Sequence, residues 1–205
     1  MSTQSQLYHQ KIGLTIKDLI ITGVFSAIIF VCIMLTGGPF AIMPALTFYF
    51  PAGSALLAGP VFLLLVAKVP KRGPITVAGL LAAVFTFATG MHWGMVLGYA
   101  AGGILADLVA GIKAYHSKEI NILSYIVFCL GGTGSYLAYF CNPQVWMGGM
   151  LEKGTPQEYL DTMYAHTGWQ VLVTMLGGTV LVALLSGMIG SRLLKKQFEK
   201  AGITA

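Results

Sequence analysis

Long uncharged runs make up most of the chain, and short charged segments separate them. Residues 40–67 and 74–105 contain no Asp, Glu, Lys or Arg, whereas the segment between them carries Lys68, Lys71 and Arg72. A run of about 20 apolar residues is long enough to cross the hydrocarbon core of a bilayer. The pattern therefore predicts an all-α membrane protein whose spans are joined by water-exposed loops.

Six transmembrane helices are predicted from these runs. They are expected at residues 16–36, 53–69, 75–89, 93–112, 122–140 and 169–194. The second and third are short against a hydrocarbon core of about 30 Å, because a helix rises about 1.5 Å per residue. Together the six form one domain, residues 15–194, between a polar N-terminal segment at 1–14 and a basic tail at 195–205.

Capping and turn residues set the expected ends of the first helix. Thr15 and Asp18 have the spacing of a capping box, in which each side chain pairs with a free backbone N–H group. Gly37, Gly38 and Pro39 are expected to end this helix, because proline and paired glycines interrupt helical hydrogen bonding.

The segment at 40–51 is uncharged and aromatic and contains two prolines, Pro44 and Pro51. It is predicted to be a loop folded in at membrane depth. Unpaired backbone groups exposed to lipid cost several kcal/mol each, so this loop is expected to be covered by protein or to border a cavity.

The longest predicted loop, residues 141–168, contains a second capping box. Thr155 and Glu158 have the required spacing, with Pro156 at the first helical position, which predicts a short surface helix ending near His166. Four residues fall on one stripe of that helix: Tyr159, Leu160, Met163 and Tyr164. We expect this helix to lie on the outer face as a lid.

Charge sets the expected orientation. Of the 205 residues 56% are hydrophobic and 9% are charged, against about 25% charged residues in soluble domains. Basic loops mark the cytoplasmic side of a membrane protein. With both termini inside, all of the twelve Lys and Arg residues except Lys153 are cytoplasmic. The net charge of +5 is therefore explained by topology in a bacterial cytoplasmic membrane, and not by a nucleic-acid surface.

Signatures of catalysis and metal binding are missing from the sequence. There is no HExxH motif and no phosphate-binding GxxxxGK[ST] loop, and Ser135 and His166 do not fit an intramembrane serine protease. The three cysteines, Cys32, Cys129 and Cys141, have no CxxC spacing and are predicted to be packing residues. Residues 1–10 show no removable leader, so the first helix is expected to act as its own insertion signal. We predict no enzymatic activity and no intrinsic cofactor.

Two ionisable residues are candidates for a specific role. Asp107 lies near the inner end of its helix, either paired to a basic residue or a helix end, or acting as a proton or ion site. His92 lies in an outer turn, where three readings stay open: an interfacial turn residue, a pocket residue, or an axial ligand to haem.

Aromatic and methionine side chains gather in the predicted outer loops. The candidate substrate-binding residues are Phe40, Met43, Phe48, Met91, His92, Trp93, Met95, Tyr139, Trp146 and Tyr164. An aromatic belt at the membrane interface explains part of this pattern, and a pocket open to the outside explains it equally. Such a pocket predicts a largely apolar, flat or ring-bearing ligand, and thiamin-like heterocycles, corrinoids and haem all fit that description.

The first helix carries a patch of small residues. Gly23, Ser26 and Ala27 have the small-xxx-small spacing that permits close backbone approach of another helix. Packing inside the protein and docking of a partner protein are the two interpretations.

Four stretches also resemble a known family. They are Thr15-Ile16-Lys17-Asp18-Leu19-Ile20; Gly59-Pro60-Val61-Phe62 with Ala67-Lys68-Val69-Pro70-Lys71; Ala106-Asp107-Leu108; and Leu193-Leu194-Lys195-Lys196-Gln197-Phe198-Glu199-Lys200-Ala201-Gly202-Ile203. With these stretches the chain resembles the substrate-binding S components of energy-coupling factor (ECF) transporters, in the Trep_Strep or MptD-like subgroup.

The resemblance implies a six-helix protein that captures a vitamin-like or cofactor-like nutrient outside the cell. Such a protein joins a transmembrane T subunit and two cytoplasmic ATPases, which use ATP, and topples in the membrane to release its substrate inside. A small-residue AxxxA pattern on the first helix of these proteins contacts the T subunit, and the matching positions here are Gly23 and Ala27. A membrane-embedded enzyme and a stand-alone transporter or channel are the alternative hypotheses.

Overall fold

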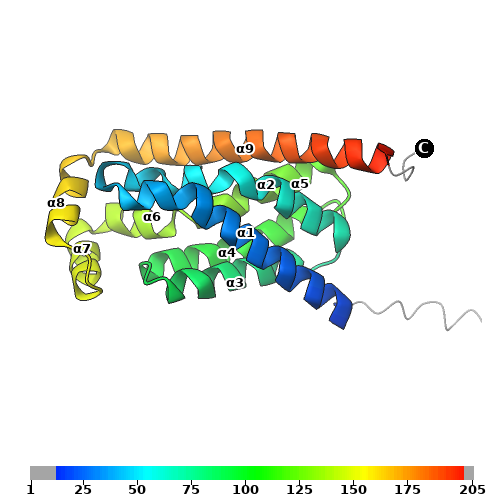
Figure 1. Ribbon diagram of the computed structural model, residues 1–205, viewed down its shortest axis with the longest axis horizontal. Helices are drawn as coiled ribbons and strands as arrows, with labels where there is room; N and C mark the ends of the chain where they lie inside the picture. Colours follow the sequence, from blue (N-terminus) through cyan, green and yellow to red (C-terminus); the bar gives the residue numbers. More distant parts are fainter. Residues whose placement is uncertain (1–12, 201–205) are drawn as a thin grey trace, which may run out of the picture.

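The computed structural model describes residues 13–200, with side chains up to Lys195, and within that range it is built of helices without a strand (Figure 1). The helices are α1 (Ile16–Ile42), the 3₁₀-helix η1 (Pro44–Tyr49), α2 (Phe50–Lys68), α3 (Pro74–Ala88), α4 (Trp93–Gly111), α5 (Lys118–Gly131), α6 (Gly134–Cys141), α7 (Pro143–Glu152), α8 (Gln157–Ala165) and α9 (Trp169–Lys200). The predicted polar N-terminal segment and basic tail fall largely outside the described residues.

Four helical segments in the described part of the chain are long and apolar enough to cross a membrane: α1, the continuous stretch Pro44–Lys68, α4 and α9. The pair α5 and α6 makes a fifth candidate span that is bent by 49°. The remaining apolar helix, α3, has 15 residues. The all-α fold is thus confirmed with four or five spans, and the sixth span stays a prediction.

The first helix does not end where the glycines and proline predicted. It begins with the expected capping box of Thr15 and Asp18, but α1 continues through Pro39 to Ile42. Gly37 is buried against α2, where an added Cβ would lie 3.0 Å from the Phe50 ring. Gly37 thus serves close packing of α1 on α2, and that packing outweighs its weak helix propensity.

The aromatic segment after α1 is helical and not an irregular loop, because η1 continues almost directly into α2. The expectation about its surroundings is confirmed: Thr47 and Phe48 are buried, and Ala41 and Thr47 border a cavity. The second half of the segment is therefore covered by protein, whereas Met43 and Leu46 are exposed.

The region from 118 to 168 departs from the prediction in three ways. The single helix expected at 122–140 begins at Lys118 and breaks between α5 and α6. The helix α7 was not predicted, although Asn142 caps it by accepting the Val145 N–H at 3.2 Å. The surface helix α8 is present, but Pro156 is its N-cap and no side chain caps it, so the predicted capping box is wrong.

Glycines hold α4 against its neighbours. Gly98 lies directly against the carbonyl oxygen of Gly131 in α5. On the other side, a Cβ at Gly103 would lie 2.7 Å from the Cα of Gly79 in α3. Any larger side chain in these positions would push the helices apart, so the glycines fix the middle of the bundle.

The molecule has two chemically different ends (Figure 1). One end, which we call the basic end, carries the α2–α3 loop, the α4–α5 turn and the end of α9, with Lys71, Arg72, Lys113, Lys118 and Lys195. The opposite end, which we call the cavity end, is formed by the α3–α4 turn, η1, α7 and α8. Both ends of the described chain lie toward the basic end.

Two carboxylates fasten the basic end. Asp18 pairs with Lys71 at 2.7 Å and so joins the start of α1 to the α2–α3 loop. Asp107 accepts hydrogen bonds from the Gly73 N–H at 2.8 Å, from Thr76 Oγ1 at 3.0 Å and from the Tyr115 hydroxyl at 3.3 Å. Of the two readings for Asp107, the structure therefore supports a carboxylate paired with a helix end, that of α3.

Candidate functional site

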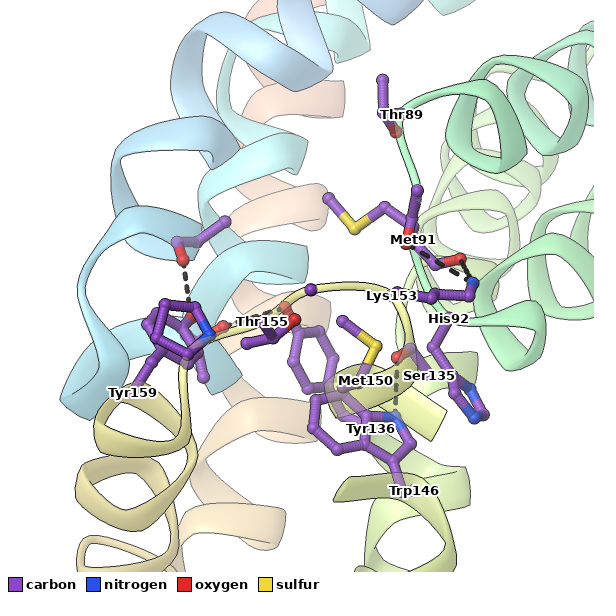
Figure 2. A pocket seen from close by; sticks show the side chains of 15 residues that line it. Thr89, Met91, His92, Ser135, Tyr136, Trp146, Met150, Lys153, Thr155 and Tyr159 are labelled. Carbon is purple, nitrogen blue, oxygen red and sulfur yellow. Dashed lines mark hydrogen bonds between the residues drawn. The ribbon is translucent and has the colours of Figure 1, made fainter. Parts of the chain in front are cut away.

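A cavity of about 380 Å³ opens at the cavity end of the bundle (Figure 2). Its walls come from the end of α1, from η1, the α3–α4 turn, α6 and α7, and the segment that leads into α8. This volume lies near the lower limit of the range of about 300–1,000 Å³ that is usual for small-molecule sites. The size favours a ligand with one or two rings over a macrocycle.

Aromatic and methionine side chains form one wall. The Trp146 indole N–H donates to Ser135 Oγ at 3.1 Å, which fixes the ring of α7 against α6. The hydroxyl oxygen of Tyr136, the residue after Ser135, lies 3.5 Å from Thr47 Oγ1. Met150 also lines the cavity. This wall supplies the flat and polarizable surface that ring-bearing ligands pack against.

Lys153 bridges the mouth of the cavity. Its ammonium group donates to the carbonyl oxygens of Met91 at 2.7 Å and Gly90 at 3.4 Å, so the α7–α8 connection is tied to the α3–α4 turn (Figure 2). Gly154 follows with φ of +90°, a backbone conformation that favours glycine and turns the chain toward α8. The tie involves carbonyl dipoles and not an opposite charge.

The helix α8 closes another side of the cavity, in agreement with the expected lid. Its Tyr159 hydroxyl donates to the Ala41 carbonyl at 2.6 Å, at the end of α1. Leu160 and Met163 of the predicted stripe are buried, whereas Tyr164 is exposed. The lid is therefore held on the bundle by apolar packing and one hydrogen bond.

His92 is the N-cap of α4. Its Nδ1 accepts the Gly94 N–H at 3.1 Å, and its ring lies against Trp93 and Trp146 with centroids 5.0 and 5.6 Å away. Burial, together with the positive charge of Lys153, lowers the pKa of His92 below its ordinary value, so the ring is neutral at pH 7. With Nδ1 accepting, the proton is on Nε2, and that tautomer has no lone pair left for a metal. The geometry thus disfavours the haem-ligand reading.

The structure brings three of the ten candidate binding residues into the cavity wall: Met91, His92 and Trp146. Phe48, Met95 and Tyr139 are buried in the helix packing, and Phe40 packs over Gly53 of α2. Met43, Trp93 and Tyr164 are exposed. These last three fit the interface-belt reading of the aromatic pattern better than the pocket reading.

Sequence reasoning missed the polar lining of the cavity. Thr47, Ser135, Tyr136, Lys153 and Thr155 all border it. The signal for Lys153 was its isolation, because it is the single cation among the predicted outer loops. Nothing in the sequence marks Ser135 or Thr47, because their direction depends on the bend between α5 and α6 and on the helicity of η1.

The small-residue patch of α1 is divided between two faces. Ser26 points inward and donates to the Thr22 carbonyl at 2.7 Å, as packing within the protein requires. Ala27 is exposed, and a Cβ added at Gly23 would meet nothing within 4 Å among the described residues. Gly23 and Ala27 therefore leave a shallow open strip on the outside of the bundle.

Two further cavities, of about 420 and 430 Å³, lie at the basic end. Their walls include His116 and Tyr115, with Lys118 beside the first and Arg72 beside the second. The first also contains Asn121, whose buried Oδ1 has no hydrogen-bond partner among the described residues. The described residues hold no cluster of three His, Cys, Asp or Glu side chains for a metal, and all three cysteines are free thiols.

Comparison with known proteins agrees with the fold. Residues 16–200 match the family described as "Hypothetical bacterial integral membrane protein (Trep_Strep)". No curated protein and no solved structure matches the chain. The family match covers most of the sequence, and together with the long apolar helices it shows a protein that passes through the membrane several times. The chain therefore belongs to the Trep_Strep family of bacterial integral membrane proteins.

Proposed function

We propose that this protein is the substrate-binding S component of an ECF-type importer, which captures a small vitamin-like or cofactor-like molecule outside the cell and delivers it inward. The observation that carries the proposal is the position of the 380 Å³ cavity, at the end of the bundle opposite the basic loops. Cationic loops lie in the cytoplasm. The cavity then faces outward, where a nutrient is captured.

The proposed topology has six spans with both termini in the cytoplasm. In it, the bent pair α5 and α6 counts as one span and the 15-residue α3 as another. A short helix such as α3 is accommodated by local thinning of the bilayer and by its flanking segments. An even number of spans agrees with the two ends of the described chain lying on one side of the molecule (Figure 1).

The transport step requires partner proteins in this proposal. The open strip of Gly23 and Ala27 on α1 is the docking surface for a T subunit, because a helix can approach the backbone closely there. Two cytoplasmic ATPases bind that subunit and hydrolyse ATP. The chain itself then needs neither a cofactor nor catalytic activity.

The alternative of a membrane-embedded enzyme has less support from the site geometry. Asp107 is occupied by three hydrogen bonds that hold α3 and Tyr115. His92 is occupied by capping α4. Each residue thus has a structural role, and no observation favours the stand-alone transporter or channel.

Co-purification tests the proposal. A tagged copy expressed with its genomic neighbours is expected to retain a T subunit and two ATPases in mild detergent. Gly23→Leu is expected to reduce the retained amount at least tenfold, because the new side chain fills the docking strip. Gly177→Leu is the matched control, since Gly177 of α9 also has nothing within 4 Å of an added Cβ. Uptake of a nutrient by the chain alone, without any ATPase, would contradict the proposal.

A further inference from the structure

We infer that the ligand of the cavity is an anionic, ring-bearing small molecule, and that Lys153 is the residue that selects its charge. The inference rests on the proposed function, in which this cavity is the capture site. It goes beyond it by naming the chemical class of the ligand, and it excludes the cationic heterocycles that the aromatic lining alone would also accept.

The charged groups that line the cavity are of one sign, whereas Glu152 and Glu158 lie next to lining residues in the sequence but are not part of the lining. None of its fifteen described lining residues is Asp or Glu, and Lys153 is the one Lys or Arg among them. His92 is neutral at pH 7, because its pKa lies below the ordinary value. A cationic ligand would therefore meet a positive charge and find no carboxylate, whereas an anionic ligand would find a counter-charge.

The hydrogen-bonding capacity points the same way. A lysine ammonium group has three donors, and Lys153 uses two of them on the carbonyls of Met91 and Gly90. Ser135 Oγ accepts from Trp146, and among the described residues its own proton has no acceptor. Thr47 Oγ1 and the Tyr136 hydroxyl lie 3.5 Å apart with either one as the donor, and Thr47 is also a hydrogen-bond partner of Tyr159, so this pair is satisfied within the protein. The cavity thus presents spare donors, which a ligand rich in acceptors satisfies.

The ring of the ligand has a defined place beside these donors. Trp146 and Tyr136 border the cavity next to Ser135, and Met91 and Met150 extend this apolar surface (Figure 2). A ligand whose ring lies on Trp146 can direct an acidic group toward Lys153 at the mouth. An anion near the ammonium group would gain a charge-assisted hydrogen bond, which is stronger than a bond to a neutral acceptor.

Three probes with the same ring separate charge from shape: phenylacetate, phenylacetamide and phenethylamine. The readout is the rate of maleimide labelling of Thr155→Cys, a cavity position, in a protein whose three native cysteines are replaced and which is held in zwitterionic lipid nanodiscs. Each rate is expressed relative to the same protein without probe, so that the effect of neighbouring charges on the thiol cancels. Phenylacetate is expected to protect the thiol at a concentration at least tenfold below that of phenethylamine, with phenylacetamide between them.

Variants of Lys153 test whether this residue causes the preference for phenylacetate. Lys153→Gln is expected to remove the advantage of phenylacetate over phenylacetamide, and Lys153→Arg is expected to keep it. Lys113→Gln, at the basic end, is the control and is expected to change nothing. The inference would be overturned if the probes protect the thiol but not in the order phenylacetate, phenylacetamide, phenethylamine, or if the preference for the anion persists in Lys153→Gln. Either result would still support the capture site. No protection by any of the three probes would overturn the capture site, and the inference with it.

Discussion

The two ends of the molecule are held by different kinds of interaction. At the basic end, Asp18 pairs with Lys71, and Asp107 accepts hydrogen bonds from the start of α3 and from the α4–α5 turn. At the cavity end the acceptors in these contacts are neutral: the Ser135 hydroxyl, the Ala41 carbonyl, and the Met91 carbonyl that receives the Lys153 ammonium group. A hydrogen bond is roughly twice as strong when its donor or its acceptor is ionised; the acceptor is ionised at Asp18 and Asp107, and the donor at Lys153.

This difference indicates which end is built to move. At the basic end, the buried carboxylate of Asp107 joins the start of α3 to the α4–α5 turn, so these segments are expected to stay in place. At the cavity end, a ligand can replace the protein groups in some of the closing contacts. For example, an acceptor of the ligand can take the place of the Met91 carbonyl that binds Lys153. If the proposed function holds, capture and release are expected to displace α7, α8 and the segment between them, while the loops of the basic end stay in place.

The largest effect is expected from breaking the basic end. Asp107→Leu removes the acceptor of the Gly73 N–H, Thr76 and Tyr115, and is expected to lower the free energy of unfolding by about 2–4 kcal/mol, because buried donors are left without partners. Unfolding in mixed micelles measures this change. Asp161→Leu, an exposed carboxylate on α8, is the matched control and is expected to change it by less than about 0.5 kcal/mol. An equal effect of both variants would contradict the account of the basic end.

An intermediate effect is expected from acidifying the cavity end. The pKa of His92 is lowered in the folded protein, so the neutral ring is favoured there, and stability is complete above the ordinary pKa of 6.5 and is lost as the pH falls below it. Protonated Nδ1 cannot accept the Gly94 N–H, and loss of a cap costs about 1 kcal/mol. Hydrogen exchange of residues 89–95, corrected for intrinsic rates, is expected to rise between pH 7 and pH 5.

His92→Asn separates the cap from general effects of acid. Asparagine caps helices without titrating, so this variant is expected to keep the slow exchange of the α3–α4 turn at both pH values. His116→Asn, at the basic end, is the control and is expected to retain the acid response of the wild type. An acid response that persists in His92→Asn would show that another group causes it.

The smallest effect is expected from the two bridging lysines. Lys71→Gln breaks a pair in which the lysine side chain is 41% exposed, so solvent screening keeps its effect on unfolding small. Lys153→Gln loses carbonyl contacts and no counter-charge, and its effect on unfolding is expected to be smaller still. Raising the salt concentration is expected to remove the effect of Lys71→Gln and to leave that of Lys153→Gln unchanged. An effect of Lys153→Gln on unfolding that depends on salt would contradict the finding that the partners of this lysine are neutral carbonyl groups.

The helices of the fold were predictable because their signal is carried by the sequence itself. Long uncharged runs locate α2, α3, α4 and α9 to within a few residues, and Thr15 with Asp18 marks the start of α1. The points at which helices end or are interrupted were not predictable in the same way. Gly37 and Pro39 resemble a helix end, yet both lie inside α1, where Gly37 packs against Phe50 of α2 and Pro39 is exposed.

The site was predictable only in part, for a similar reason. Met91, His92 and Trp146 were found because they lie in or beside turns that the charge pattern places on one side. Phe48 and Tyr139 have the same chemistry but pack against each other, with ring centroids 5.3 Å apart. Which aromatic residue turns toward a cavity depends on the bend between α5 and α6, and no local pattern encodes it.

The account depends on the two ends facing opposite compartments, and cysteine labelling in intact cells tests this most directly. In a protein without its native cysteines, a membrane-impermeant maleimide is expected to label Gln157→Cys on α8 at once. His116→Cys at the basic end is expected to react only after the cells are permeabilised. Labelling of His116→Cys in intact cells, with Gln157→Cys protected, would invert the orientation and contradict the proposed capture of a ligand from outside.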